Sequence, residues 1–244
     1  FGLIKSRNTM AVRVGNRAGI QHVCRLAKHA GIAIPENTEN PQLFLGNLDC
    51  DLKSLTSAYT IFPNTGARVP AFTIRSIVNT RGETFYRAAA QSYPAAPAGA
   101  CALTAEILQG VLAQDGSGYK ARRLGYKKSA GGKTGTTNDF KDAWFIGFTD
   151  KVTCGVWAGL DRPQTIMPGA YGSNVALPIW TDIMLACERF GYPAGKLRPS
   201  IPMTNITLCR ISGNVAGSGC QRAGMAYRAS IPHELAPKQS CRGH

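Results

Sequence analysis

The segment with the clearest chemical potential runs from residue 130 to residue 137, where glycines lead into Lys133-Thr134-Gly135-Thr136-Thr137. Lys133 supplies a fixed positive charge, and the threonine hydroxyls can bind a carboxylate. Backbone N–H groups along such a strand can face the carbonyl of a substrate bond that is to be broken. The glycines carry no side chain, which predicts that the backbone of a substrate approaches this segment as an added strand.

A second candidate element, Ser6-Arg7-Asn8, precedes a helix-like run near the start of the chain. Ser6 can relay a proton, and the amide of Asn8 can bind a substrate amide. A simpler alternative is that Ser6 caps a helix that begins near Thr9. Ser-x-Asn and Lys-Thr-Gly are similar to two of the three signature elements of serine β-lactamases and penicillin-binding proteins, and the third, Ser-x-x-Lys, carries the nucleophile.

A literal Ser-x-x-Lys occurs once, at Ser117-Gly118-Tyr119-Lys120. It follows the Ser-x-Asn triplet and lies in a glycine-rich stretch, whereas the nucleophile is expected earlier and at the start of an apolar helix. We therefore interpret it as a coincidence. A phosphate-binding loop is also excluded, because Lys127 stands where that motif requires a glycine. None of the four histidines has a partner motif that would predict a histidine-based triad.

The composition indicates a basic globular chain with an anionic partner. The 244 residues include 28 Lys and Arg against 14 Asp and Glu, which gives a net charge of +14. The basic residues are scattered and not interleaved with aromatic residues, so we expect no nucleic-acid binding. No apolar run reaches the length of about 18 residues that a membrane span requires. Because the first residue is Phe1, we interpret the chain as a fragment without its N-terminal part.

The cysteines fall into two groups. Five are dispersed through the body of the chain, and three, Cys209, Cys220 and Cys241, lie near the C-terminus with His244. In an oxidising compartment this cluster favours a disulfide. A zinc site formed by the three cysteines and His244 is one alternative, and free thiols are another.

Hydrophobic periodicity predicts alternating helices and strands. We expect helices over residues 20–30, 52–62, 103–114 and 175–190, a small hairpin at 72–87, and strands over 133–137, 143–148 and 152–160. Proline, glycine, serine and cysteine dominate after the last helix. The expected division is therefore a body of residues 1–198 and a cysteine-containing tail of residues 199–244.

The motifs and their surroundings resemble the C-terminal part of the transpeptidase domain of class A, bifunctional penicillin-binding proteins. The similar segments extend beyond the two short motifs and cover roughly residues 1–190. They are Ser6 to Arg13, Ser57 to Pro70, Lys133 to Asp139, Asp142 to Phe148, Val156 to Gly159, and Ala176 to Trp180.

The resemblance implies an α/β (α+β) fold of the serine β-lactamase and penicillin-binding-protein type, with an antiparallel sheet packed between helices and with its N-terminal part missing. It also implies cross-linking of peptidoglycan stem peptides by a serine D,D-transpeptidase through an acyl-enzyme, with the nucleophile upstream of this chain. This fragment alone is then expected to be inactive. Ser6, Asn8 and Lys133 would be catalytic, while Thr134, Gly135, Thr136 and Thr137 would bind substrate.

The expected partners are stem peptides, β-lactam antibiotics and other proteins of wall synthesis. No cofactor or metal is expected for the reaction. The resemblance places the chain on the periplasmic side of the inner membrane, held by an anchor upstream of Phe1. Two other functions compete with this one: a non-catalytic module that binds penicillin or the cell wall, and a hydrolase or sensor of the β-lactamase type.

Overall fold

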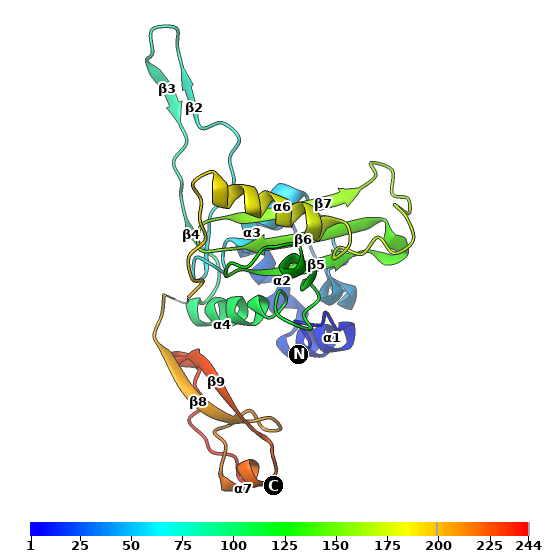
Figure 1. Cartoon of the computed structure of the whole chain (residues 1–244), viewed down its shortest axis with the longest axis vertical. Coiled ribbons are helices and arrows are strands. Elements are labelled where there is room, and N and C mark those ends of the chain that lie inside the picture. The colour runs from blue at the N-terminus through cyan, green and yellow to red at the C-terminus, as the bar shows by residue number, and fades with distance from the viewer. Residues whose placement is uncertain (199, 244) are drawn as a thin grey trace.

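The centre of the molecule is a three-stranded antiparallel sheet in the order β5-β6-β7 (Figure 1). The structure is a computed structural model, and it describes residues 1–198 and 200–243. β5 spans Gly131–Thr136, β6 spans Asp142–Phe148 and β7 spans Thr153–Gly159. β5 forms an edge of this sheet, because it pairs with β6 on one side only.

Helices cover both faces of this sheet. The α-helices of the body are α1 (Asn8–Ala18), α2 (Ile20–His29), α3 (Leu52–Tyr59), α4 (Ala98–Gln109), α5 (Lys120–Arg123) and α6 (Ala176–Arg189). Short 3-10 helices are η1 (Pro41–Leu45) and η2 (Asn138–Phe140). Helices α6 and α3 each pack on strands β6 and β7, and α4 packs on β5.

The alternation of side chains along β6 assigns these helices to opposite faces of the sheet. Phe145 points toward α6, where its ring centroid lies 5.0 Å from that of Trp180. Phe148 points the other way and stacks on Phe62 at 5.7 Å, beside α3 and α4. Gly147 leaves room for Trp180, since a Cβ there would lie 2.7 Å from the indole ring. The expected antiparallel sheet between helices is therefore confirmed.

Most of the expected elements are present with small shifts in their ends. The helix expected over 103–114 is the main exception, because α4 begins and ends five residues earlier. Pro97 occupies its N-cap position, and the stretch that follows is rich in alanine, a strong helix former. The helix ends before Gly110, and residues 110–118 continue as turns around further glycines.

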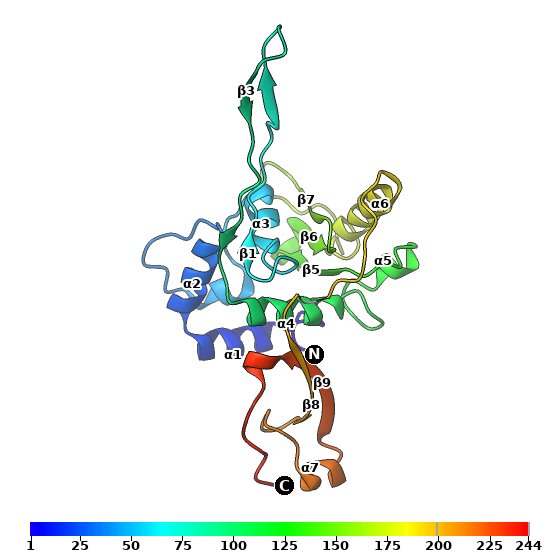
Figure 2. The same ribbon diagram turned by 90° about the vertical axis from the view of Figure 1, so that its left-hand side faces the viewer.

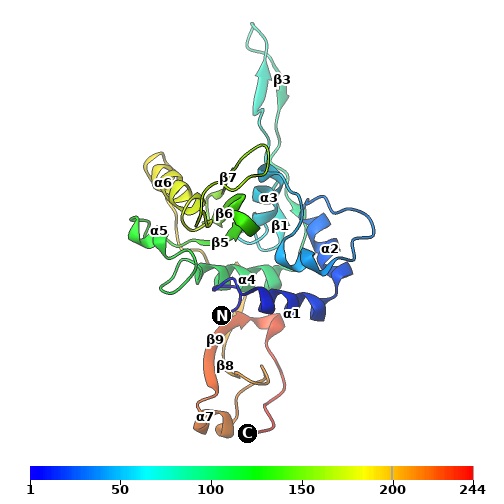
Figure 3. The same ribbon diagram turned by 90° about the vertical axis from the view of Figure 1, so that its right-hand side faces the viewer.

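Two hairpins lie outside the main sheet. β2 (Ser76–Val78) and β3 (Thr84–Arg87) form an exposed hairpin that confirms the one expected at 72–87, and β1 (Ala67–Arg68) pairs with β4 (Tyr93–Pro94). Figures 2 and 3 show the β2–β3 hairpin projecting from one side of the body and the C-terminal residues from the opposite side.

The C-terminal residues contain strands that the sequence analysis did not predict. β8 (Met203–Cys209) and β9 (Ala226–Pro232) form a two-stranded antiparallel pair, with α7 (Ser218–Arg222) between them and η3 (His233–Leu235) after them. Glu234 connects this part to the body, because its carboxylate accepts a hydrogen bond of 3.0 Å from the N–H of Gly99 in the first turn of α4. A negative charge is favourable at that end of a helix.

No helix in residues 1–198 or 200–243 combines the length and apolar character needed to cross a bilayer.

The core side of α6 predicts a sharp contrast between two neighbouring residues. Trp180 is fully buried, while Ile179 is 46% exposed. We expect Trp180→Ala to lower the free energy of unfolding by about 3–5 kcal/mol and Ile179→Ala to lower it by less than about 1 kcal/mol. Urea unfolding of the two variants measures this difference, and equal losses would contradict the assignment of the α6 core face.

Candidate functional site

The two sequence motifs meet in space through one hydrogen bond. The ammonium of Lys133 on β5 donates to the hydroxyl oxygen of Ser6, with Nζ and Oγ 2.6 Å apart. The same ammonium donates to the carbonyl oxygen of Thr134 at 2.8 Å. Ser6 and Lys133 are 127 positions apart in the chain, so their contact joins the N-terminal segment to the edge of the sheet.

The surroundings of Lys133 make its amine more acidic than an ordinary lysine. Burial disfavours the charged form and lowers the pKa of Lys133 from 10.5 to about 8. The amine is therefore mostly protonated at neutral pH but can release a proton at a modest cost. A group of this kind suits proton transfer as well as electrostatic stabilisation.

Ser6 does not act as a helix cap. Helix α1 begins at Asn8, its N-cap position is Arg7, and no side chain caps it. Ser6 instead has a φ of 53°, a left-handed conformation that is uncommon for a residue with a side chain. Backbone strain of this kind often accompanies functional positions. The alternative reading of Ser6 as an N-cap is therefore wrong.

Asn8 lies two residues after Ser6, at the first position of α1, and its side chain is exposed. The Ser-x-Asn triplet thus brings Ser6 to Lys133 and leaves Asn8 accessible to a ligand.

The threonines of β5 have different surroundings. Thr134 lies within hydrogen-bond distance of Ser117, with their hydroxyl oxygens 3.3 Å apart. The Thr136 hydroxyl oxygen accepts a hydrogen bond of 3.0 Å from the N–H of Gly172. That bond leaves the Thr136 O–H group able to donate to a ligand. Gly172 belongs to the loop before α6, which the sequence analysis did not connect with the site.

Thr137 is held at the end of the sheet. Its hydroxyl donates to the carboxylate of Asp142 at 3.1 Å and accepts from the Asp142 N–H at 2.8 Å. The other carboxylate oxygen of Asp142 accepts from the indole N–H of Trp157 at 2.8 Å. These contacts fix the connection between β5 and β6, so the bonds of Thr137 support the strand.

The glycines of β5 also differ from one another. Gly131 and Gly132 are buried. A Cβ on Gly131 would lie 2.8 Å from the Phe148 ring, and a Cβ on Gly132 would lie 2.7 Å from the Phe145 ring. Their small size therefore permits core packing, and the expected approach of a substrate backbone does not apply to them. Gly135 is half-buried, farther along the edge strand.

Ser117 lies closer to the site than the sequence analysis implied. Its hydroxyl is next to Thr134, and its N–H donates to the carbonyl oxygen of Ile4 at 3.3 Å. The Lys120 side chain of the same tetrapeptide is exposed. The structure therefore gives Ser117 a place beside β5 without giving it a buried lysine partner from its own motif.

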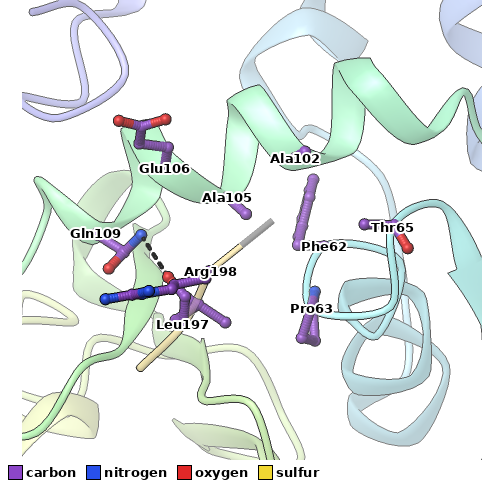
Figure 4. Close-up of a pocket in the computed structure, with 9 residues that line it drawn as sticks. All are labelled: Phe62, Pro63, Thr65, Ala102, Ala105, Glu106, Gln109, Leu197 and Arg198. Atoms are coloured by element: carbon purple, nitrogen blue, oxygen red, sulfur yellow. Dashed lines mark hydrogen bonds between the residues drawn. The ribbon is translucent and has the colours of Figure 1, made fainter. Parts of the chain in front are cut away.

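A hollow beside α4 is distinct from this site. Its lining includes Gln109 of α4 and Leu197, which precedes the C-terminal residues (Figure 4). The side-chain amide of Gln109 donates a hydrogen bond of 3.4 Å to the carbonyl oxygen of Leu197. The hollow has room for about one water molecule and includes neither Ser6 nor Lys133. The site around Lys133 is instead an open strand edge.

The chain is similar in sequence to several curated proteins, although no protein-family model matches it. Penicillin-binding protein 1A of Rickettsia bellii (strain RML369-C) is 35% identical over 210 residues, which cover 75% of this chain and 26% of that protein. Penicillin-binding protein 1A of Aquifex aeolicus (strain VF5) is 34% identical over 194 residues, with coverage of 79% and 26%. The chain thus spans about a quarter of the length of these relatives.

Solved structures share the fold. Penicillin-Binding Protein 1A from Haemophilus influenzae matches with a TM-score of 0.83 and 19% identity, over 98% of this chain and 40% of that one. PonA1 from Mycobacterium tuberculosis in complex with penicillin V matches with a TM-score of 0.68 and 23% identity, over 82% and 57%. The D,D-transpeptidase domain of a peptidoglycan glycosyltransferase from Eggerthella lenta matches with a TM-score of 0.57 and 17% identity, over 76% and 52%.

The lowered pKa of Lys133 predicts a specific dependence of stability on pH. Between pH 8 and pH 10.5 the unfolded chain binds more protons at this amine than the folded chain does. Stability therefore rises with pH across that window. We expect the free energy of unfolding of the parent chain to rise relative to that of Lys133→Met from pH 8 to pH 10.5, and to run parallel to it at lower pH.

Urea unfolding at a series of pH values measures this difference. Lys53→Met, which removes an exposed lysine on α3, controls for general effects of alkaline pH. If the free energies of unfolding of the parent and of Lys133→Met change in parallel over the whole pH range, the lowered pKa of Lys133 is contradicted.

Three observations agree on the identity of this fold. The sheet lies between helices, Ser-x-Asn meets Lys-Thr-Gly at the edge of β5, and the curated relatives are named penicillin-binding protein 1A. The chain is therefore a member of the penicillin-binding protein 1A family.

Proposed function

We propose that this chain forms part of a serine D,D-transpeptidase that cross-links peptidoglycan stem peptides, and that Ser6 and Lys133 assist a nucleophilic serine on another segment of the protein. The observation that carries the proposal is the hydrogen bond of 2.6 Å between Ser6 and Lys133 beside an open strand edge. It joins a proton relay, a fixed cation and a strand-binding surface in one place.

The proposed reaction has two acyl-transfer steps. The serine oxygen attacks the carbonyl between the two terminal D-alanines, a C–O bond forms, the C–N bond breaks, and D-alanine leaves with a proton on its nitrogen. An amine from a neighbouring strand then attacks the ester carbonyl, a new C–N bond forms, the C–O bond of the ester breaks, and the serine oxygen takes up the proton that the amine loses. A β-lactam ring that resembles the dipeptide would acylate the same serine.

Ser6 and Lys133 are suited to deliver the proton to the leaving nitrogen. The Ser6 oxygen accepts a hydrogen bond from the Lys133 ammonium, so its own O–H group is available to donate to a substrate. As Ser6 gives up its proton, Lys133 can replace it, because its pKa of about 8 lies near neutral pH. Lys133 thus acts through Ser6 while its charge stabilises the developing oxyanion.

The remaining residues are proposed to bind the peptide. An extended stem peptide adds to the edge of β5, where backbone groups hold it as an extra strand. The O–H groups of Thr134 and Thr136 and the charge of Lys133 bind its terminal carboxylate, and the Thr136 N–H contributes to the oxyanion hole. Asn8, exposed beside Ser6, binds an amide of the peptide. Gly135 and Thr137 maintain the strand next to these contacts.

The nucleophile is proposed to lie outside these 244 residues. Ser117 is beside Thr134, but Lys120 of the same tetrapeptide is exposed and does not provide the buried amine that activates such a serine. In the same N-terminal segment as Ser6, the apolar side chains of Leu3, Met10 and Val14 are exposed. A further segment that packs on them would bring a serine toward the pair of Ser6 and Lys133.

Charge and fold support the remaining proposals. The net charge of +14 favours association with an acidic wall polymer, outside the cytoplasm and on a protein anchored through another segment. β-Lactams and other wall-synthesis proteins are the proposed further partners. The chain divides functionally into a body of residues 1–198, which carries the site, and a C-terminal unit of residues 199–244.

The proposal is tested by the mass of the intact protein after treatment with benzylpenicillin. In the complete protein that contains this chain, we expect one stable adduct of one drug mass, and peptide mapping should place it on a serine outside residues 1–244. The 244-residue chain alone serves as the control, and we expect it to gain no mass because it supplies supporting groups only.

Three results would overturn this assignment in different ways. An adduct on Ser6, Ser117 or any other residue of this chain would show that the nucleophile was misplaced. A folded complete protein without an adduct would favour a non-catalytic binding module, and rapid release of hydrolysed drug would favour a β-lactamase.

A further inference from the structure

The C-terminal unit brings three cysteine sulfurs together from three separate segments. Cys209 is the last residue of β8, Cys220 lies in α7, and Cys241 lies in the final segment of the chain. Their sulfur atoms all lie within 4.8 Å of one another. Cys209 and Cys220 are fully buried, and Cys241 is half-buried.

Backbone hydrogen bonds hold these three segments in register. The N–H of Cys209 donates to the carbonyl oxygen of Asn214 at 2.9 Å, and the N–H of Cys241 donates to that of Val215 at 2.8 Å. The carbonyl oxygen of Cys220 accepts from the N–H of Met225 at 2.8 Å. Each cysteine is therefore positioned by its own main chain, and the convergence of the sulfurs is a property of the fold.

The unit has a very small apolar core. Among its described residues, 200–243, the buried apolar side chains are Leu208, Cys209, Cys220, Ile231 and Pro232. Two of these five are cysteines of the cluster. A core of this size is insufficient to stabilise a unit of some forty residues, and units of that size usually depend on disulfides or a metal ion.

The number of converging sulfurs distinguishes a metal ion from a disulfide. A disulfide joins two sulfurs at about 2.05 Å and would leave the third cysteine of the cluster without a role. Tetrahedral zinc with Zn–S distances of about 2.3 Å places its sulfur ligands about 3.8 Å apart. The three sulfurs lie within 4.8 Å of one another, so no separation exceeds that of the zinc ligands by more than about 1 Å.

Cysteine binds a metal ion in its thiolate form. Thiolate ligands select soft or borderline ions such as zinc over the hard cations magnesium and calcium.

We propose that Cys209, Cys220 and Cys241 bind one structural zinc ion, which stabilises the C-terminal unit on α4. The ion bonds to three thiolates, whose protons are released on binding, and a fourth ligand completes the tetrahedral coordination. The expected participation of His244 falls outside the described residues, and the proposal does not depend on it. This site is separate from the pair of Ser6 and Lys133, and it takes no part in acyl transfer.

The test measures zinc in the purified 244-residue chain after refolding with zinc and removal of unbound metal. We expect about one zinc ion per chain, and we expect Cys220→Ser to lower zinc retention at least tenfold. Cys50→Ser, which removes a half-buried cysteine outside the cluster, is the matched control and should retain the ion.

Cobalt(II) in place of zinc gives a second readout that does not depend on the stability of a variant. The parent chain should show thiolate-to-cobalt charge-transfer absorption, which zinc abolishes by displacement. A parent chain that binds neither metal would overturn the proposal. So would a disulfide between any two of the three cysteines in the zinc-treated protein, found by peptide mapping without reductant.

Discussion

The site depends on keeping one ammonium group partly buried at the edge of a sheet. Burial favours the neutral amine of Lys133 and lowers its pKa to about 8. The Ser6 hydroxyl oxygen and the Thr134 carbonyl oxygen accept hydrogen bonds from its ammonium form. These two acceptors compensate in part for the lost hydration. The lysine therefore remains both a cation and a proton donor near neutral pH, and either property alone would be less useful for acyl transfer.

The rest of the body positions this group. Trp180 and Phe145 pack on one face of the sheet, and Phe148 and Phe62 stack on the other, so β6 is held from both sides. β5 takes its register from β6, with Lys133 opposite Ile146. At the N-terminal side, the left-handed φ of Ser6 turns the chain into α1 and directs its hydroxyl to β5. The contact thus depends on the packing of the whole body.

The sequence predicted the local parts of this arrangement well. The central strands and α6 follow from clear periodicity, and the motif residues Ser6 and Lys133 do meet. The sequence did not predict the strands of the C-terminal unit, because prolines and glycines surround them. A signal was nevertheless present in β8, where Ile206 and Leu208 alternate with Asn205 and Thr207.

Contacts between distant segments were also beyond the sequence. Nothing in the local pattern shows that Gly172 binds Thr136 or that Ser117 lies beside Thr134, because both contacts depend on how loops return to the sheet. The buried glycines of β5 illustrate the same limit. Their spacing is compatible with substrate approach or with core packing, and only the positions of Phe145 and Phe148 decide between the two.

Ser6 and Lys133 are proposed to act as one catalytic unit, and a double-mutant cycle measures their coupling. The rate of acylation by benzylpenicillin is measured in the complete protein for Ser6→Ala, for Lys133→Ala and for the double variant. Each single change is expected to lower the rate by about 10²–10³-fold, and the double change by no more than the larger of the two, because the residues share one function. A loss of rate in the double variant equal to the product of the two single losses would show that the residues act independently. Single changes that leave the acylation rate unchanged would show that they take no part in it.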